Sequence, residues 1–222
     1  MPTIEYAANG GKAHGYLAKP EGGGNGKGVI VVQEWWGLMP HIQDIADRFA
    51  KEGYLALAPD LWDGKKTTSP DEAGRMLMAL NIHDAHQKLA GAIAELHKQG
   101  AKGKLGIVGF CMGGQLALYT ACAIPDEIGA CVDFYGIHPN VKPKFEGLEA
   151  PALLIFGEKD PSVTPANGKE MARAIQSHGK QVEVKVFEGG HAFFNDARPE
   201  AYVEASAKQA WKDTLAFFVT HL

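Results

Sequence analysis

The chain has 222 residues, a net charge of −4 and a composition that is 45% hydrophobic, 9% aromatic and 22% charged. These proportions are typical of a packed globular protein and exclude a disordered, collagen-like or coiled-coil chain. The 22 basic residues form no cluster among the 26 acidic ones, which disfavours nucleic-acid binding. No apolar run approaches the roughly 20 residues that a membrane-spanning helix needs.

The N-terminal residues and the cysteines bear on location. The segment MPTIEYAANG lacks the basic and apolar regions of a secretory signal. The three cysteines, Cys111, Cys122 and Cys131, are too few for a disulfide framework and have no CxxC spacing. We therefore expect a cytoplasmic monomer that has no nucleic-acid or membrane partner.

The chain begins with a predicted hairpin, in which extended runs at residues 4–6 and 14–18 flank the turn signal Asn9-Gly10-Gly11. A glycine-rich stretch over residues 20–28 follows, and we expect it to be a surface loop. Apolar runs then alternate with amphipathic segments. The runs typical of buried strands are residues 29–32, 55–58, 105–108, 130–134, 153–156 and 182–187. The predicted helices cover residues 42–50, 71–80, 84–98, 115–123, 163–177 and 199–219.

This alternation predicts an α/β fold with a mostly parallel central sheet and helices on both faces. No shift in composition divides the chain, so we expect a single domain over residues 1–222. Ligands of such folds bind at the carboxyl ends of the strands. Candidate functional residues should therefore follow the strands directly. The sequence leaves open whether residues 62–82 form a lid.

Cys111 lies in the motif G-F-C-M-G-G, residues 109–114, which follows a predicted strand and begins a helix. This is the nucleophile-elbow pattern with Cys in place of Ser. Its glycines leave room for a sharp turn and for a close approach of helix to sheet, and the helix N-terminus favours a thiolate. The alternative is a structural cysteine in a glycine-rich turn. Cys122 and Cys131 lie in apolar patterns and are interpreted as core residues.

Asp160 and His191 also follow predicted strands, in G-E-K-D and E-G-G-H. Taken alone, Asp160 fits an ordinary turn or helix cap, and His191 is one of nine histidines. The chain order Cys111, Asp160, His191 is nevertheless that of the α/β-hydrolase triad. We therefore expect a nucleophile, an acid and a base at three strand ends.

The loop Q-E-W-W-G follows the strand at residues 29–32. In α/β-hydrolases this loop supplies one oxyanion-hole N–H, and the residue after the nucleophile supplies the other. The backbone N–H groups of Trp35 and Met112 are the corresponding donors here. Glu34 beside them is unexpected, because a carboxylate repels the developing negative charge.

With these motifs the chain resembles the dienelactone hydrolase family, the carboxymethylenebutenolidases, which have the α/β-hydrolase fold. The resemblance runs nearly end to end, through Q-E-W-W-G, A-P-D-L, G-F-C-M-G-G, F-Y-G, G-E-K-D and G-G-H-A-F. It implies that Cys111 is the nucleophile, His191 the base and Asp160 its orienting residue. It also implies that Glu34 contacts the resting thiol and takes part in its activation.

One departure from the family concerns the substrate. The best-known members hold the carboxylate of a dienelactone with arginines, one of them shortly after the catalytic His. Here the nearest candidates are Arg198 and Arg75, and Arg75 fits a solvated helix position equally well. The resemblance therefore implies the mechanism but not dienelactone as the substrate. The aromatic residues Trp36, Tyr135 and Phe193 are candidate walls of an apolar substrate pocket, although each also fits packing.

We thus expect a cysteine-dependent hydrolase of small-molecule esters or lactones that forms an acyl-enzyme and needs no metal or organic cofactor. One alternative is a non-catalytic protein on the same fold, with Cys111 as a redox-sensing thiol. Another is metal binding through His83 and His86 with Asp84, a spacing that matches known sites only weakly.

Overall fold

The computed structural model describes residues 3–222, and these form an eight-stranded sheet with the order β1-β2-β4-β3-β5-β6-β7-β8. The strands β1 and β2 are antiparallel to each other, and β2 is antiparallel to β4, whereas the remaining neighbours are parallel. The mostly parallel sheet predicted from the sequence is therefore confirmed. The strands are β1 (Thr3–Ala8), β2 (Gly11–Ala18), β3 (Gly28–Val32), β4 (Leu55–Pro59), β5 (Leu105–Phe110), β6 (Ile128–Phe134), β7 (Ala152–Gly157) and β8 (Val182–Phe187).

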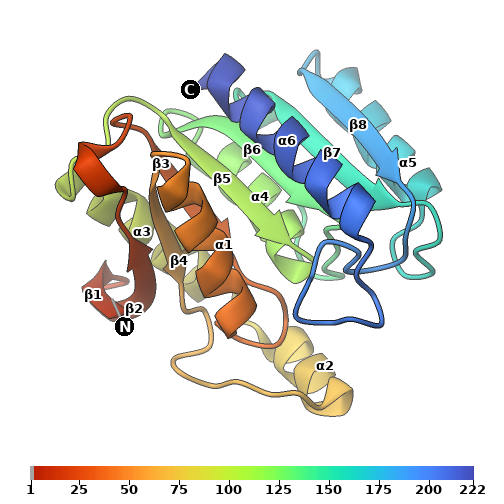
Figure 1. Cartoon of the computed structure of the whole chain (residues 1–222), viewed down its shortest axis with the longest axis horizontal. Helices are drawn as coiled ribbons and strands as arrows, with labels where there is room; N and C mark the ends of the chain where they lie inside the picture. Colours follow the sequence, from red (N-terminus) through yellow and green to blue (C-terminus); the bar gives the residue numbers. More distant parts are fainter. Residues whose placement is uncertain (1–2) are drawn as a thin grey trace.

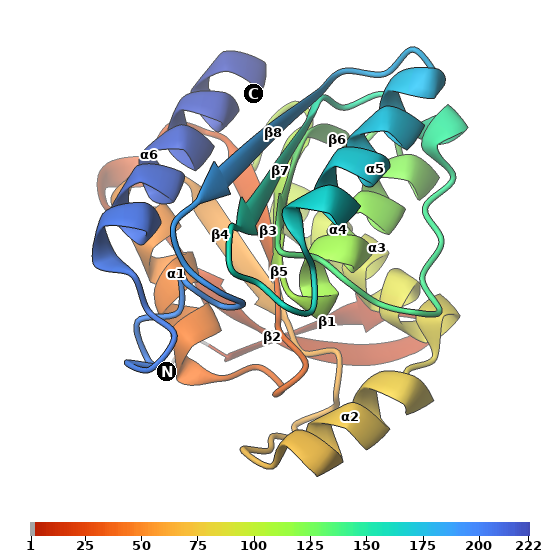
Figure 2. The same ribbon diagram turned by 90° about the vertical axis from the view of Figure 1, so that its right-hand side faces the viewer.

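Helices cover both faces of the sheet, α1 and α6 on one and α3, α4 and α5 on the other (Figures 1 and 2). The short helix α2 projects from the rest of the molecule beyond the carboxyl ends of the strands (Figure 2). The helices are α1 (Pro40–Lys51), α2 (Pro70–Ala79), α3 (Ile82–Lys98), α4 (Met112–Ala123), α5 (Pro165–Ser177) and α6 (Glu204–His221). Two 3₁₀ turns, η1 (Glu21–Gly23) and η2 (Phe145–Gly147), lie in connecting loops.

The first hairpin forms as predicted. Asn9 and Gly10 connect β1 to β2, and both have positive φ angles, 50° and 71°. A two-residue turn of this kind matches the twist of the two strands, and Asn-Gly is the pair that adopts it most readily. The strand β2 then pairs with β4 and joins the hairpin to the parallel part of the sheet.

The core lies on both sides of the central strands. Every residue of β3, β4, β5 and β7 is buried. A parallel sheet covered by helices on both faces has no solvated side, which explains why these strands are continuous apolar runs. None of the helices within residues 3–222 has both the length and the apolar composition needed to cross a bilayer.

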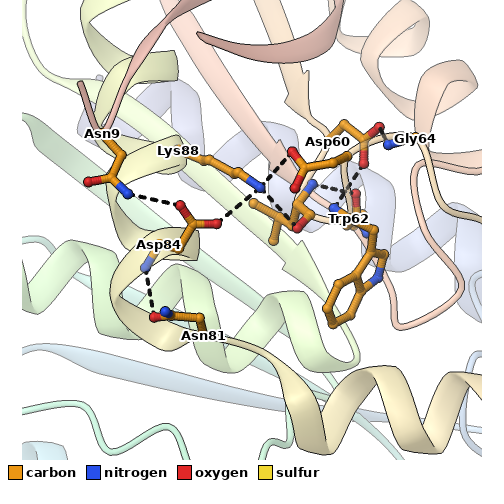
Figure 3. A network of polar contacts seen from close by, with 10 residues as sticks. Asn9, Asp60, Trp62, Gly64, Asn81, Asp84 and Lys88 are labelled. Carbon is orange, nitrogen blue, oxygen red and sulfur yellow. Dashed lines mark hydrogen bonds and ion pairs between the residues drawn. The ribbon is translucent and has the colours of Figure 1, made fainter. Parts of the chain in front are cut away.

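A buried lysine fixes the loop that follows β4 (Figure 3). Lys88 of α3 forms ion pairs with Asp63 and Asp84, at 2.8 and 3.1 Å. Asp60 at the end of β4 accepts hydrogen bonds from the N–H groups of Trp62 and Gly64, at 3.0 and 2.7 Å. These contacts hold the start of the segment that leads to α2.

The last helix is shorter than predicted. It begins at Glu204, whereas the sequence pattern indicated a helix from residue 199. The backbone N–H groups of Ala201 and Tyr202 bond to the carbonyl of Arg198, and that of Val203 bonds to the carbonyl of Phe193. The loop after β8 thus occupies the donors that a longer helix would use.

Candidate active site

Cys111 lies on a strained turn between β5 and α4, as the elbow motif predicts. Its φ is 54° and its ψ is −124°, a backbone conformation that non-glycine residues rarely adopt. Three hydrogen bonds hold it there: its N–H donates to the carbonyl of Phe134, and its carbonyl accepts from the N–H groups of Gly114 and Ile137. Strain that the surroundings maintain in this way is typical of functional sites.

The glycines of the elbow are required by space. A Cβ on Gly109 would lie 2.0 Å from the carbonyl oxygen of Gly113, and a Cβ on Gly113 would lie 2.4 Å from that of Val32. A Cβ on Gly114 would lie 1.9 Å from the Oδ1 atom of Asp133. The elbow is therefore packed against both β3 and β6 without room for a methyl group.

His191 and Asp160 form a hydrogen-bonded pair. His191 Nδ1 lies 2.7 Å from Asp160 Oδ2, and the other carboxylate oxygen accepts from the N–H groups of Ser162 and Val163, at 2.7 and 3.0 Å. Burial raises the pKa of Asp160, but the hydrogen bonds and the charge of His191 outweigh it and lower the pKa below its usual value. Asp160 is therefore an ionised acceptor that orients the imidazole.

The pKa of His191 is shifted in the opposite direction from that of a merely buried histidine. Burial lowers it, but hydrogen bonds and charge interactions with Asp160 and Cys111 raise the pKa to about 10. The structure thus brings Cys111, Asp160 and His191 together from the ends of β5, β7 and β8.

The two backbone donors expected for an oxyanion hole, Met112 and Trp35, follow the elbow cysteine and β3. Met112 is the first residue of α4, so its N–H has no acceptor within the helix. Trp35 lies in the loop after β3. The buried side chain of Gln33 ties that loop to the end of β4, because its Oε1 atom accepts from the N–H of Leu61 at 3.2 Å.

Glu34 is buried and hydrogen-bonds to a residue that the sequence analysis did not single out. Its Oε2 atom accepts from Asn195 Nδ2 at 3.0 Å. Burial raises the pKa of Glu34 to about 7, against the opposing effects of His191, Arg198 and Asn195. The resemblance implied that Glu34 contacts the thiol. Here its hydrogen-bond partner is Asn195, which compensates the burial of the carboxylate. Cys111 instead contributes to the raised pKa of His191.

A pocket of about 480 Å³ opens beside Glu34. Trp36 lines it, together with residues of the loop before α2 and of the loop after His191. Tyr135 and Phe193 do not line it: both are fully buried, and the ring of Tyr135 lies 5.0 Å from that of His191 and 5.8 Å from that of Phe193. Tyr135 thus packs against the ring of His191, and Phe193 packs against Tyr135 and Phe187, instead of forming walls of this pocket.

The two candidate arginines differ. Arg198 lines the pocket, with its guanidinium carbon 5.7 Å from the Trp36 ring centroid and its Nε donating to Glu200 at 2.8 Å. Arg75 is exposed on α2 and is not part of the pocket lining. A cation therefore reaches the pocket from Arg198, seven residues after His191.

The other two cysteines and the candidate metal ligands are accounted for by packing and ion pairing. Cys122 and Cys131 are buried, and burial raises the pKa of both thiols, that of Cys122 to about 12. Asp84, the acid between His83 and His86, forms an ion pair with Lys88. Within residues 3–222, no three His, Cys, Asp or Glu side chains are grouped as metal ligands.

Sequence reasoning missed Asn195 and His41, which both line the pocket. Asn195 follows His191 by four residues, so its place in a functional loop is visible in the sequence. Its bond to Glu34, 161 residues away, is not. His41 falls within the apolar pattern of α1, where nothing distinguishes it from a packed core histidine.

Comparisons with known proteins identify the family of this chain. Residues 13–222 match the model of the dienelactone hydrolase family. The chain is 39% identical to the protein usf of Aquifex pyrophilus, over 99% of this chain and 98% of that protein. It is 35% identical to an Aquifex aeolicus protein whose assigned name is that of a carboxymethylenebutenolidase, with the same coverage.

Comparison with a solved structure identifies the same family. A Klebsiella pneumoniae protein named as a dienelactone hydrolase superposes with a TM-score of 0.88 at 30% identity, covering 99% of this chain and 98% of that one. The eight-stranded, mostly parallel sheet is thus that of an α/β-hydrolase. The chain belongs to the dienelactone hydrolase family.

Proposed function

We propose that this chain hydrolyses carboxylic esters or lactones through a Cys111–His191–Asp160 triad and a thioester acyl-enzyme. The observation that carries the proposal is the hydrogen-bonded His191–Asp160 pair, whose imidazole interacts with a cysteine on a strained elbow. The family supports the reaction class, since a relative from Aquifex aeolicus bears the name of a carboxymethylenebutenolidase.

In the first half of the reaction, the sulfur of Cys111 attacks the carbonyl carbon and the carbonyl electrons move to oxygen. The N–H groups of Trp35 and Met112 donate hydrogen bonds to this oxyanion. When the intermediate collapses, the ester oxygen leaves with a proton from His191, and the acyl group remains on sulfur as a thioester. In a lactone both products stay in one molecule.

In the second half, water attacks the thioester while His191 accepts its proton, and the thiolate of Cys111 leaves as the acid is released. A histidine with a pKa near 10 is a poor base at neutral pH. Part of that shift comes from Cys111, however, and acylation removes the charge of the thiolate. The pKa of His191 therefore falls when a base is needed.

Glu34 acts as a gate in this scheme. With a pKa of about 7, it exchanges its proton near neutral pH. As substrate binds, the ionised carboxylate accepts the proton of the thiol, and the neutral acid then no longer repels the oxyanion. Glu34 returns this proton to the thiolate of Cys111 once the acid product is released. Glu34 lines the pocket that we take as the substrate site, whereas Cys111 and His191 are not among the lining residues of that pocket.

The substrate class follows from the nucleophile and the pocket. A thiolate is a better leaving group than most alkoxides, so the tetrahedral intermediate reverts unless the ester oxygen is activated, as in an aryl or enol ester. A pocket of about 480 Å³ suits a small molecule rather than a long acyl chain. We expect the enzyme to act as a monomer and to need no metal.

Acyl-enzyme trapping tests the proposal. Phenyl acetate mixed with the protein and quenched at once should leave one acetyl group on Cys111, detected by peptide mass spectrometry. Cys111→Ala should abolish turnover, whereas Cys131→Ala should retain it, and chelation with EDTA should have no effect. Turnover by Cys111→Ala, or acetylation of another residue instead, would contradict the mechanism.

A further inference from the structure

The α2 arm, which we define as residues 66–80, carries the helix that projects beyond the carboxyl ends of the strands (Figure 2). This helix buries one of its ten residues, Ala73, whereas α4 buries nine of twelve. Segments with little buried surface open locally at a lower free energy than the fold as a whole. This property distinguishes the arm from the helices that are packed on the sheet.

Two hydrogen bonds join the arm to other segments of the described chain. At the start of the arm, the N–H of Thr67 donates to the carbonyl of Trp36 at 3.0 Å. Near its end, the carbonyl of Leu77 lies 3.1 Å from Nε2 of His138, a buried residue of the loop after β6. The second bond is thus the contact that holds the far end of α2 to the body of the molecule.

The partners of His138 fix its protonation. The N–H of Asn140 donates to its Nδ1 atom at 3.1 Å, so the ring proton is on Nε2. Burial lowers the pKa of His138 against the opposing effect of its bond to Leu77, so the imidazole is neutral at pH 7. Nε2 therefore donates to the carbonyl of Leu77.

Both ends of the arm are anchored. Before it, Lys88 holds Asp63 at 2.8 Å (Figure 3), and after it Asn81 caps α3 by accepting from the N–H of Asp84 at 3.1 Å. Asp63 and Gly64, between the first anchor and the arm, have positive φ angles of 53° and 86°. A segment with fixed ends and a weakly held middle has the arrangement of a hinged lid.

The arm contacts both the pocket and the loop after β3. Thr67 and Pro70 line the pocket, and a Cβ on Gly74 would lie 4.0 Å from the ring of Trp35. Cys111 is buried and is not among the lining residues, so an ester in the pocket does not meet the sulfur in this arrangement. Part of the surroundings must therefore move before the attack, and the arm is a wall that few contacts hold.

We propose that the α2 arm opens as a lid that gives esters access to Cys111, and that the bond from His138 to Leu77 latches this lid closed. The two anchored ends stay in place, and the chain turns at Gly64 and Leu80. The inference rests on the proposed function, because it takes Cys111 as the group that the ester must reach.

Hydrogen exchange followed by mass spectrometry measures the opening. In the wild-type protein the amides of α2 should exchange through local opening, well before those of α4. His138→Ala removes the latch and should speed exchange in α2 by about fivefold, the effect of one net hydrogen bond. His97→Ala is the matched control, because His97 Nδ1 lies 3.2 Å from the carbonyl of Ala101, away from the arm, and α2 should exchange as in the wild type.

A second variant weakens the arm without altering the latch. Arg75 is exposed within α2, so Arg75→Gly should also speed exchange in α2 by about fivefold, since glycine disfavours a helix interior. Lys212 is exposed within α6, and Lys212→Gly removes the same charge and adds the same glycine there. This control should leave exchange in α2 unchanged.

Alkylation of Cys111 by N-ethylmaleimide, followed by peptide mass spectrometry, tests whether the opening exposes the sulfur. His138→Ala and Arg75→Gly should each speed alkylation by about fivefold, in step with exchange in α2, and the two controls should not. Unchanged alkylation in variants whose α2 exchanges faster would overturn the inference, as would exchange in α2 as slow as in α4. Neither measurement requires turnover, so a failure of every ester to react would count against the proposed function alone.

Discussion

The side-chain amide of Asn195 donates a 3.0 Å hydrogen bond to the carboxylate of Glu34, and both residues are buried. Asn195 lies in the same loop as His191, and Glu34 precedes Trp35, the proposed oxyanion donor. The bond therefore connects the loop that carries the proposed base, His191, to the loop that carries the proposed oxyanion donor, Trp35. The charge of Glu34 depends on this contact as well as on burial.

Replacing Glu34, or the Asn195 side chain that donates to it, should alter the dependence of kcat on pH near neutrality. Glu34→Gln removes the group that titrates near pH 7, so kcat should fall by about a hundredfold and the inflection should disappear. Asn195→Ala removes a hydrogen bond that lowers the pKa of Glu34, so the inflection should move upward by roughly one unit, equivalent to about 1.4 kcal/mol. Profiles of kcat against pH measure both effects. Wild-type profiles in both variants would make Glu34 an ordinary buried carboxylate.

Asp160→Asn should uncouple the base from its orienting residue. The hydrogen bond and charge of Asp160 raise the pKa of His191, so the variant should have a His191 with a lower pKa. Loss of the acceptor also permits the wrong tautomer, and kcat should fall on the order of a thousandfold. A ¹H–¹⁵N titration of His191 reports the pKa separately from the rate. An unchanged pKa with a reduced rate would assign the loss to misplacement of the imidazole alone.

Asp133 should make the protein less stable as pH rises. It lies fully buried in β6 against Gly114 of the elbow helix, and burial raises its pKa to about 7 against a smaller opposing effect of the Gly136 backbone. Between pH 4 and 7 the folded state holds a proton that the unfolded state releases, so the free energy of unfolding decreases with pH over this range. Asp133→Asn should weaken that decrease. Urea unfolding at pH 5 and pH 8 tests this, and equal pH dependence in both proteins would contradict it.

Two glycine-to-alanine substitutions should change the stability of the fold in opposite directions. Gly114→Ala places a methyl group 1.9 Å from Asp133 Oδ1, so it should cost about 3 kcal/mol of stability or more. Gly74 lies in α2, where an added Cβ meets nothing closer than 4.0 Å, so Gly74→Ala should stabilise by about 0.5–1 kcal/mol. Thermal unfolding of the two variants provides the comparison. If Gly114→Ala left the stability unchanged, the elbow would have to adjust to an added side chain.

The sequence predicted correctly those turns and strands whose conformation depends on residues nearby in the chain. Asn9-Gly10 adopts its turn from backbone preference alone, and the fully apolar strands are recognisable because both of their faces are buried. The start of α6 was wrong by five residues, because the competing acceptor for Val203, the carbonyl of Phe193, lies in a loop that periodicity does not describe. Tyr135 and Phe193 were candidate pocket walls for a similar reason: the sequence does not distinguish an aromatic residue facing a pocket from one packed behind the base.

The sequence by itself determined the sheet, the elbow and the chain order of the proposed nucleophile, acid and base, because each depends on residue types at fixed positions relative to a strand end. Only the tertiary structure decided which polar groups share a buried environment. Glu34 has its raised pKa because distant segments exclude water around it, and Asn195 satisfies it across 161 residues. His191 and His41 each pair with an aspartate, yet the pKa of one is raised to about 10 and that of the other is lowered to about 4. The difference arises from desolvation and neighbouring charge, which depend on distances in space that sequence separation does not specify.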